Sequence, residues 1–288
     1  MNKARYSILR FHKAFPDNDT CLGYLFTALY GKPKCPACRR VGAYYLRKGT
    51  SHYVCMCGKH NISPKQGTIF AKSDTDLAKW FFAMYLMTAS KNGVSAKELE
   101  RELEVTYKTA WRIAKELRSL MEQVPGVFDG IVEADETYVG GIRPGTRGRG
   151  AKGKTPIVGI VKRQGGVRAV VVADCKASTV MPLIRSSVKI GTELMTDKFP
   201  SYNKARKMGY KHESVDHGRK EYARGKVHTN TIEGFWSQLK RSIDGTYHSV
   251  SPKHLQKYVD EFAWRYNLRA SDAPLFPILL SQVGASKR

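Results

Sequence analysis

The sequence predicts an α/β domain preceded by a cysteine-rich module and a helical module, and three observations indicate this fold class. Residues 31–67 are rich in Gly, Pro and Cys and contain short β-type runs. Residues 74–122 show the apolar spacing of helices. From residue 130 onward, β-type runs alternate with amphipathic segments, as in α/β proteins. We therefore expect four parts: 1–70 (an amino-terminal helix and the cysteine-rich module), 71–124 (the helical module), 129–270 (the α/β domain) and 271–288 (a tail).

The elements of the α/β domain follow from their apolar patterns. Strands are expected at 131–139, 156–161, 167–173, 193–196 and 212–215, and helices at 178–188, 201–208, 229–242 and 252–267. The helix at 229–242 has the clearest pattern, because its apolar residues from Ile232 to Leu239 lie on one side. A segment rich in Gly, Arg and Lys, residues 140–154, indicates an exposed loop between the first two strands.

The charge of the chain favours a polyanionic partner. Lys and Arg total 49 against 25 Asp and Glu, a formal net charge of +24, and each phosphate that such residues neutralise releases counterions. We expect double-stranded DNA, although a basic protein without such a partner is the alternative. The loop supplies candidate DNA contacts at Arg143, Arg147, Arg149, Lys152 and Lys154.

The sequence indicates a location inside the cell. No apolar run approaches the ~18 residues that cross a bilayer. Residues 1–10 are charged and lack the apolar stretch of a signal peptide. We expect a cytoplasmic, nucleoid-associated protein with no membrane partner.

Two close cysteine pairs predict a structural zinc site. The pairs are Cys35-x-x-Cys38 and Cys55-x-Cys57, and zinc is held in structural sites by four tetrahedral ligands. Two such knuckles joined by a β-hairpin form a zinc ribbon. The second pair is one residue shorter than usual, so His52 or His60 could replace a cysteine, and four free cysteines are the alternative to a metal site.

Residues 93–112 fit a helix-turn-helix. Ser95 and Glu98 form a capping-box pattern for the first helix, and Thr106 is placed to cap the second. The start of the second helix would turn four side chains outward as candidate DNA contacts: Tyr107, Lys108, Thr109 and Arg112. An ordinary hairpin of two helices fits the same pattern.

Three carboxylates are placed as two-metal phosphodiester chemistry requires. Asp135 lies in a strand that is apolar at residues 131, 132, 134 and 139 and also holds Glu133 and Glu136, and an acid in such a strand is costly unless it is paired or binds metal. Asp197 follows the strand at 193–196, and Glu233 lies on the helix at 229–242. Two Mg²⁺ or Mn²⁺ ions are the expected catalytic cofactors. Glu133 or Glu136 could replace Asp135, and Asp174 or Asp216 could replace Asp197. The histidines 217, 228 and 248 are not included among the expected metal ligands.

From about Cys35 to Asn267 the chain resembles the zinc-ribbon-bearing DDE insertion-sequence transposases. The resemblance rests on the cysteine pairs and on the order of short motifs. Thirty-five residues also separate Asp197 from Glu233. The motifs are Gly-Thr-Ile-Phe at 67–70, Ala-Asp-Glu-Thr-Tyr-Val-Gly-Gly at 134–141, Thr196-Asp197 followed by Tyr202, His-Thr-Asn-Thr-Ile-Glu-Gly-Phe-Trp-Ser at 228–237, and the matching segments 247–255 and 261–267.

The resemblance implies an RNase H-like fold, a mixed central sheet flanked by helices, over about 129–270. It places Asp135 on the first strand, Asp197 just after the fourth and Glu233 on a later helix. It also implies that Lys240 touches the DNA of the transposon end. Some relatives have Asn as the third ligand, so Asn230 could share that role with Glu233.

The implied function is that of a transposase that acts as a multimer on paired DNA ends. Such a protein binds terminal inverted repeats, here through residues 31–122, cleaves the strand and joins the freed 3′-hydroxyl to target DNA. The alternatives are a DNA-binding regulator with an inactive catalytic domain and a domesticated nuclease of the same fold that transfers no strand.

Overall fold

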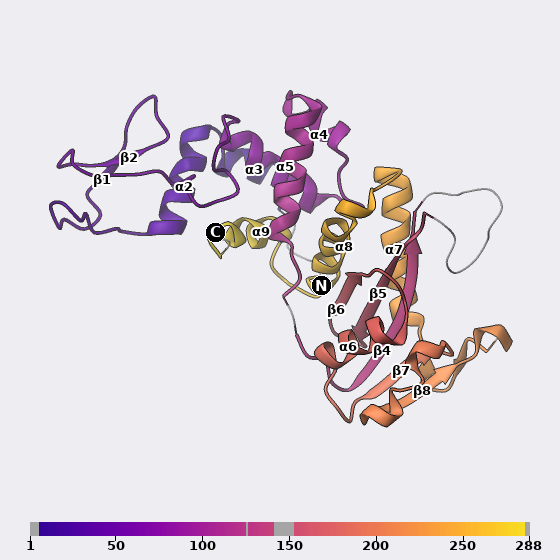
Figure 1. Cartoon of the computed structure of the whole chain (residues 1–288). Helices are drawn as coiled ribbons and strands as arrows, with labels where there is room; N and C mark the ends of the chain where they lie inside the picture. Colours follow the sequence, from indigo (N-terminus) through magenta and orange to yellow (C-terminus); the bar gives the residue numbers. More distant parts are fainter. Residues whose placement is uncertain (1–5, 125, 141–152, 220, 286–288) are drawn as a thin grey trace. The chain divides into compact units, whose positions relative to one another are not determined.

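The computed structural model describes residues 6–124, 126–140, 153–219 and 221–285. The chain divides into two compact units. The first unit joins residues 1–120 with residues 271–288, and the second comprises residues 121–270. Figure 1 labels their elements along the chain.

The first unit is a small antiparallel sheet beside a set of helices. The sheet has the order β1-β2-β3 and corresponds to the cysteine-rich module. Helix α3 is almost wholly apolar, and residues such as Trp80, Phe81 and Met84 are fully buried in the core. The elements are α1 (Ile8–Ala14), α2 (Asn18–Tyr30), β1 (Tyr44–Leu46), β2 (Tyr53–Cys55), β3 (Asn61–Ile62), α3 (Leu77–Ala89), α4 (Ala96–Leu103), α5 (Tyr107–Leu120) and α9 (Leu275–Ala285).

Residues 271–288, which we expected to form a tail, contribute the buried helix α9 to this unit. Its residues Phe276, Leu279, Leu280 and Val283 are each less than 5% exposed. Phe276 packs against Tyr6, Phe11 and Phe15 with ring centroids 4.9–5.8 Å apart. The spacing i, i+3, i+4, i+7 of these apolar residues is a helical signal that the sequence already carried.

The second unit is built on a five-stranded mixed sheet of order β6-β5-β4-β7-β8. β4 pairs with β5, and β5 with β6, antiparallel; β4 pairs with β7, and β7 with β8, parallel. Helix α6 lies on one face and helices α7 and α8 on the other (Figure 1). The bounds are β4 (Ile131–Val139), β5 (Thr155–Lys162), β6 (Val167–Val171), α6 (Ala177–Ser187), β7 (Glu193–Asp197), β8 (Lys211–Val215), α7 (Asn230–Ser242) and α8 (Pro252–Asn267).

The apolar character of the strands follows from burial on both faces of the sheet. Val132 and Ala134 of β4 pack toward α6, whereas Val139 packs toward α7 and α8. Neighbouring strand residues point to opposite faces, so Glu133 and Asp135 lie on the face of α7 and Glu136 lies on the face of α6. The expected RNase H-like fold, a mixed sheet flanked by helices, is confirmed.

The connection from β7 to β8 differs from expectation. Instead of one helix over 201–208, it forms two 3₁₀ turns, η1 (Pro200–Tyr202) and η2 (Arg206–Met208). Gly209, whose φ is +91°, ends the second turn in the left-handed region. After β8 come the 3₁₀ turn η3 (His217–Arg219) and a hairpin of β9 (Ala223–Arg224) with β10 (Val227–His228). The π-helical turn η4 (Ile243–Tyr247) follows α7.

Candidate active site and cysteine cluster

Asp135 and Asp197 are placed side by side by two parallel strands. Ala134 of β4 is in register with Thr196 of β7, so the next residue of each strand is a carboxylate at the same level of the sheet. Asp135 is the fifth residue of β4, the first strand of the sheet, and Asp197 ends β7, the fourth. This arrangement agrees with the placement that the resemblance implied.

Asp135, Glu136 and Asp197 form an acidic cluster, in which one carboxylate oxygen from each lies within 4.8 Å of the others. Glu136 and Asp197 are each only 8% exposed. Burial, together with the negative charges of Glu136 and Asp197, raises the pKa of Asp135 to about 7. Such crowding of carboxylates is relieved when a cation binds between them, so this donor set fits a divalent metal ion with oxygen ligands.

Trp236 orients Asp135. The indole Nε1 of Trp236, on α7, donates a hydrogen bond to Asp135 Oδ2 at 3.0 Å. Gly159, which faces Asp135 on β5, makes room for the indole, because a Cβ there would lie 2.4 Å from Trp236 Cζ2. A residue without a side chain therefore lets the ring reach the carboxylate.

Glu133 anchors the start of α7. It is fully buried, and its Oε2 accepts hydrogen bonds from the backbone N–H groups of Thr231 at 2.8 Å and Ile232 at 3.0 Å. Arg163 donates to Glu133 Oε1 at 2.6 Å. Thr229, the N-cap of α7, accepts no capping hydrogen bond with its side chain, so Glu133 satisfies the first amides of the helix from the neighbouring strand. These contacts explain an acid at this position of β4 without a metal.

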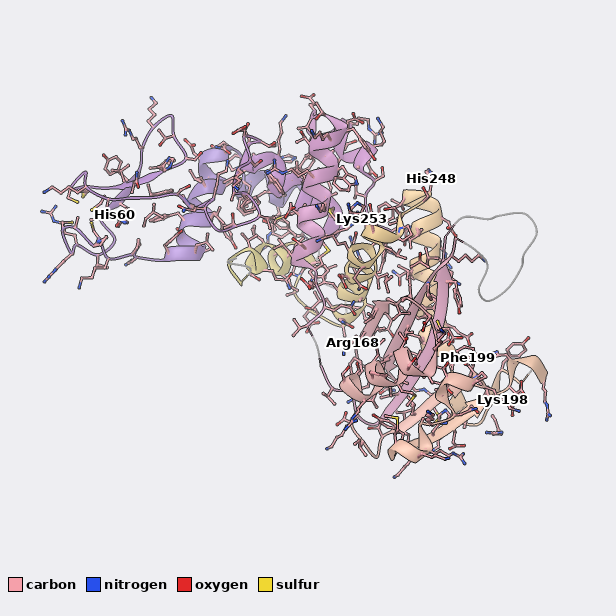
Figure 2. All side chains as sticks on the ribbon, viewed as in Figure 1. His60, Arg168, Lys198, Phe199, His248 and Lys253 are labelled. Carbon is pink, nitrogen blue, oxygen red and sulfur yellow. The ribbon has the colours of Figure 1, made fainter. Side chains whose placement is uncertain are left out.

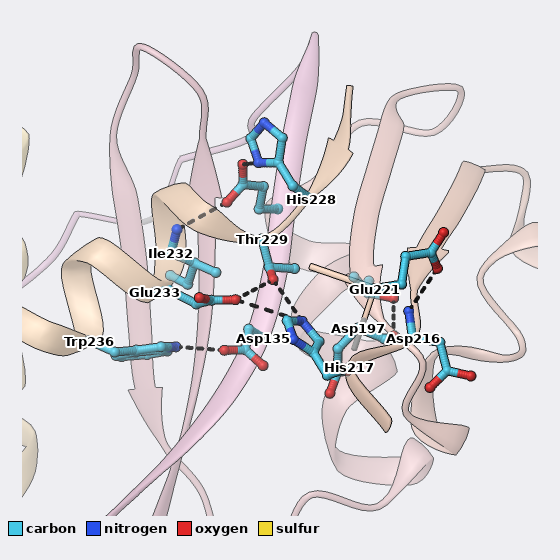
Figure 3. Close-up of polar contacts among 12 residues, drawn as sticks. Asp135, Asp197, Asp216, His217, Glu221, His228, Thr229, Ile232, Glu233 and Trp236 are labelled. Atoms are coloured by element: carbon cyan, nitrogen blue, oxygen red, sulfur yellow. Dashed lines mark hydrogen bonds and ion pairs between the residues drawn. The ribbon is translucent and has the colours of Figure 1, made fainter. Parts of the chain in front are cut away.

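Glu233 lies on the exposed side of α7, between the Glu133 anchor and Trp236. Its carboxylate accepts a hydrogen bond from the Thr229 hydroxyl at 2.7 Å and lies 3.7 Å from His217 Nε2 (Figure 3). Among the described residues, the acidic cluster defined by the 4.8 Å limit does not contain Glu233. The structure thus brings the carboxylates of Asp135 and Asp197 together, whereas Glu233 is more exposed and lies outside the acidic cluster.

The alternative acids have other partners. Asp174 accepts hydrogen bonds from the Thr179 hydroxyl at 2.7 Å and from the N–H of Lys176 at 3.0 Å. Asp216 lies 3.1 Å from Lys198 Nζ. Neither belongs to the acidic cluster in the described part of the chain, which favours Asp197 as the second carboxylate.

Glu136 was considered as a replacement for Asp135, but it joins the acidic cluster beside Asp135, and its contact with Tyr202 is one that the sequence did not indicate. The Tyr202 hydroxyl donates to Glu136 Oε2 at 3.2 Å, and Tyr202 is fully buried in η1. Burial and the charges of Glu136, Asp135 and Asp197 raise the pKa of Tyr202, so it remains a hydrogen-bond donor. Tyr202 belongs to one of the short sequence motifs, but its contact with Glu136 depends on the order of the strands.

The four cysteines converge in the first unit. Cys35 Sγ lies 3.8 Å from Cys57 Sγ, and Cys38 Sγ lies 3.6 Å from Cys55 Sγ. Four sulfurs at ~2.3 Å from a tetrahedral zinc would lie about 3.8 Å apart, so the cluster fits this ion. The positive φ of Gly58, +70°, closes the short second knuckle, and its N–H donates to the carbonyl of Cys55 at 2.8 Å.

The histidines considered as substitute ligands lie outside this cluster. His60 Nδ1 is hydrogen-bonded to the Tyr44 hydroxyl at 2.8 Å, and Figure 2 labels it in the cysteine-rich module. His52 is likewise absent from the group of four cysteines that the described residues form. The structure therefore favours a ligand set of cysteines alone.

Helices α4 and α5 form the pair expected from the sequence, joined by a short turn. Ser95 accepts from the N–H of Glu98 at 3.1 Å, and Thr106 from the N–H of Thr109 at 3.3 Å. Tyr107 and Lys108 are exposed, whereas Thr109 is half-buried. Arg112 is exposed but turns back to donate to the carbonyl of Lys72 at 3.2 Å. The role of this pair in DNA binding stays a prediction.

Two further candidate DNA contacts lie on α7. Lys240 is exposed on α7, two turns after Glu233, and Asn230 is exposed at the start of the helix. Of the basic loop, Arg143, Arg147, Arg149 and Lys152 lie outside the described residues, and Lys154 is half-buried just before β5.

No described helix combines the length and the apolar character that a membrane span requires.

Comparisons with known proteins find similarity to transposases. Residues 127–267 match the model of the ISXO2-like transposase domain. The chain is 31% identical to an uncharacterized protein in transposable element ISH50 of Halobacterium salinarum, over 80% of this chain and 84% of that protein. It is 30% identical to an uncharacterized transposase-like protein of Haemophilus influenzae, over 35% of this chain and 80% of the relative.

A solved structure of a pre-cleavage Mos1 transpososome aligns over 67% of this chain and 74% of its own, with 14% identity. Its TM-score of 0.29 is too low to relate the two folds. The halobacterial relative, in contrast, matches most of both chains, and the domain match spans the two strands that carry the acidic cluster. The chain therefore belongs to the insertion-sequence family of DDE transposases, with an ISXO2-like transposase domain at residues 127–267.

Proposed function

We propose that this transposase binds the terminal inverted repeats of its element through residues 31–122 and cleaves and joins DNA strands with Asp135, Asp197 and Glu233. The convergence of Asp135 and Asp197 from parallel strands is the observation that carries the proposal. Bound Mg²⁺ or Mn²⁺ would supply Lewis-acid stabilisation to the attacking and leaving oxygens of a phosphodiester.

The side chains around the cluster prepare it for this role. Trp236 holds Asp135 in one orientation, and Tyr202 does the same for Glu136. Preorganised ligands need little rearrangement when the substrate arrives. Glu233 is the more exposed carboxylate, 47% exposed in its side chain, and it lies where a DNA phosphate can approach it from solvent. Water is the nucleophile for cleavage, and the freed 3′-hydroxyl is the nucleophile for joining.

The cysteine cluster is proposed to bind structural zinc, since four protein ligands leave no open position for catalysis. Protein purified without added metal should then contain about one zinc per chain by elemental analysis. We also propose that the transposase acts as a homo-oligomer on paired ends.

A strand-transfer assay on labelled DNA carrying the element's end tests the proposal. Asp135→Asn, Asp197→Asn and Glu233→Gln should each lower cleavage and joining at least about a hundredfold in Mg²⁺, because each removes a charge that holds the metal. End binding and zinc content should stay at the wild-type level, because the first unit is unchanged.

Asp129→Asn is the matched control, since it removes the same charge from an exposed residue of the second unit. Cleavage without joining would indicate the nuclease alternative. Binding by a wild-type protein that neither cleaves nor joins would indicate the regulator. Activity that survives in all three variants would exclude the DDE mechanism.

A further inference from the structure

An exposed aromatic pair follows β8. Tyr222 is 61% exposed, and its ring lies edge-to-face with the imidazole of His217, with centroids 5.4 Å apart and planes at 68°. An exposed tyrosine that is braced by a second ring offers a rigid face on which another planar group can stack. No role in the proposed chemistry explains its exposure.

The pair adjoins the proposed active site. His217 Nε2 lies 3.7 Å from Glu233 Oε1 and 3.5 Å from the Thr229 hydroxyl, and Figure 3 shows His217 directed toward these two groups. Only one imidazole therefore separates the Tyr222 ring from a carboxylate that is proposed to act on DNA. A group stacked on Tyr222 would belong to a nucleotide close to the reacting phosphate.

A basic cavity of about 510 Å³ is lined by residues that follow β7 or lie in η2, β8, η3 and β9, and Asp216 and Glu221 in this lining are the chain neighbours of His217 and Tyr222. This volume is in the range of sites for small ligands, roughly 300–1,000 Å³. Among the described residues, four cations face two acids there, so the lining carries a net positive charge that suits a phosphodiester. The lining residues are Lys198 (labelled in Figure 2), Arg206, Ser214, Asp216, Arg219, Glu221 and Arg224.

We propose that Tyr222, braced by His217, stacks on an unpaired base of the bound DNA, and that the basic cavity holds the adjoining phosphate. The inference rests on the proposed function for the position of the DNA. A base, rather than a peptide side chain, fits an aromatic face and a cationic cavity that occur together beside the carboxylates. Such stacking would keep one nucleotide unpaired and outside the duplex, at a position next to the reacting bond.

Fluorescence anisotropy in Ca²⁺, with the full chain, tests this proposal without requiring cleavage. The probe is a labelled duplex with a short single-stranded extension of thymidines, and one abasic nucleotide is moved stepwise along that extension. The wild type should lose roughly 5- to 150-fold in affinity when the abasic nucleotide occupies one particular position, because that is the range one stacked base contributes.

Tyr222→Ala should bind the complete extension more weakly by a similar factor and show no further weakening with the abasic nucleotide at that position. Tyr222→Phe keeps the ring and should behave as the wild type. Ile190→Ala changes another exposed apolar residue of the same unit, 63% exposed, and should also have no effect.

Two results would overturn the proposal. One is that Tyr222→Ala binds every probe as tightly as the wild type. The other is that it weakens binding but stays as sensitive as the wild type to the abasic nucleotide, so that no base depends on the ring. Failure of the proposed function would show separately, as a wild-type protein that does not cleave element ends in Mg²⁺.

Discussion

Gly159 and Trp236 together fix the environment of Asp135. The indole occupies the space that a side chain at residue 159 would fill, and it thereby covers one side of the carboxylate while donating to it. Burial and the negative charges of Glu136 and Asp197 raise the pKa of Asp135 to about 7, whereas the hydrogen bond from Trp236 acts in the opposite direction. A substitution of Gly159 on β5 should therefore alter the environment of Asp135 on β4.

Gly159→Ala should lower the free energy of unfolding by about 1–3 kcal/mol, because the added Cβ would lie 2.4 Å from the Trp236 ring in a packed core. Cleavage should fall as well, since the ring must move away from Asp135. Chemical denaturation and the strand-transfer assay measure the two effects.

Gly234→Ala is the matched control. A Cβ at Gly234 meets nothing within 4 Å, so alanine should stabilise α7 slightly, by up to about 1 kcal/mol. Equal behaviour of the two variants would contradict the role of Gly159 as the space for the indole.

At the scale of an element, α7 is registered on the sheet by two contacts with the same strand. Glu133 accepts the first amides of α7, and Trp236 reaches Asp135 further along. The helix and β4 therefore run together, and Glu233 is held between the two contacts. The position of Glu233 thus depends on Glu133, although Glu133 takes no part in the proposed chemistry.

Glu133→Ala should lower the free energy of unfolding by about 3–5 kcal/mol, because it leaves Arg163 and the first amides of α7 without their buried partner. Glu193→Ala removes a half-buried carboxylate that pairs with the exposed Lys226 at 2.6 Å, and it should cost far less, because solvent screens this pair. Denaturation curves of the two variants compare the costs. Similar values for both would show that Glu133 does not anchor the helix.

The sequence predicted the elements better than the contacts between them. The sequence singled out Asp135 and Asp197, which the structure brings together, because an acid in a largely buried strand and an acid at a strand end are local patterns. The anchoring role of Glu133 could not, because it requires a helix about a hundred residues later in the chain to start beside it. The contact of Tyr202 with Glu136 likewise depends on strand order. Arg112 was correctly placed as exposed, but its long side chain reaches a backbone carbonyl that no spacing indicates.

At the scale of the whole molecule, the net charge of +24 should govern affinity for DNA. Replacing Arg143, Arg147, Arg149, Lys152 and Lys154 with glutamine should flatten the plot of log affinity against log salt by roughly 0.9 for each phosphate that the loop no longer neutralises. Preference for the end sequence should not change, because binding to phosphates carries no sequence information. Binding isotherms at several salt concentrations measure the slope. An unchanged slope would show that this loop does not touch DNA.

Helix α9 has a consequence for how the protein is made. The core of the first unit is completed by Phe276 and its neighbours, yet residues 121–270 are synthesised before them. At ~5–20 residues per second, those 150 residues take roughly 8–30 s to emerge from the ribosome. During that time the aromatic rings that α9 later contacts, such as Phe11 and Phe15, lack their packing against Phe276. The first unit of a nascent transposase, which is proposed to read DNA, therefore matures only after the second unit, which is proposed to carry the catalytic carboxylates, has left the ribosome.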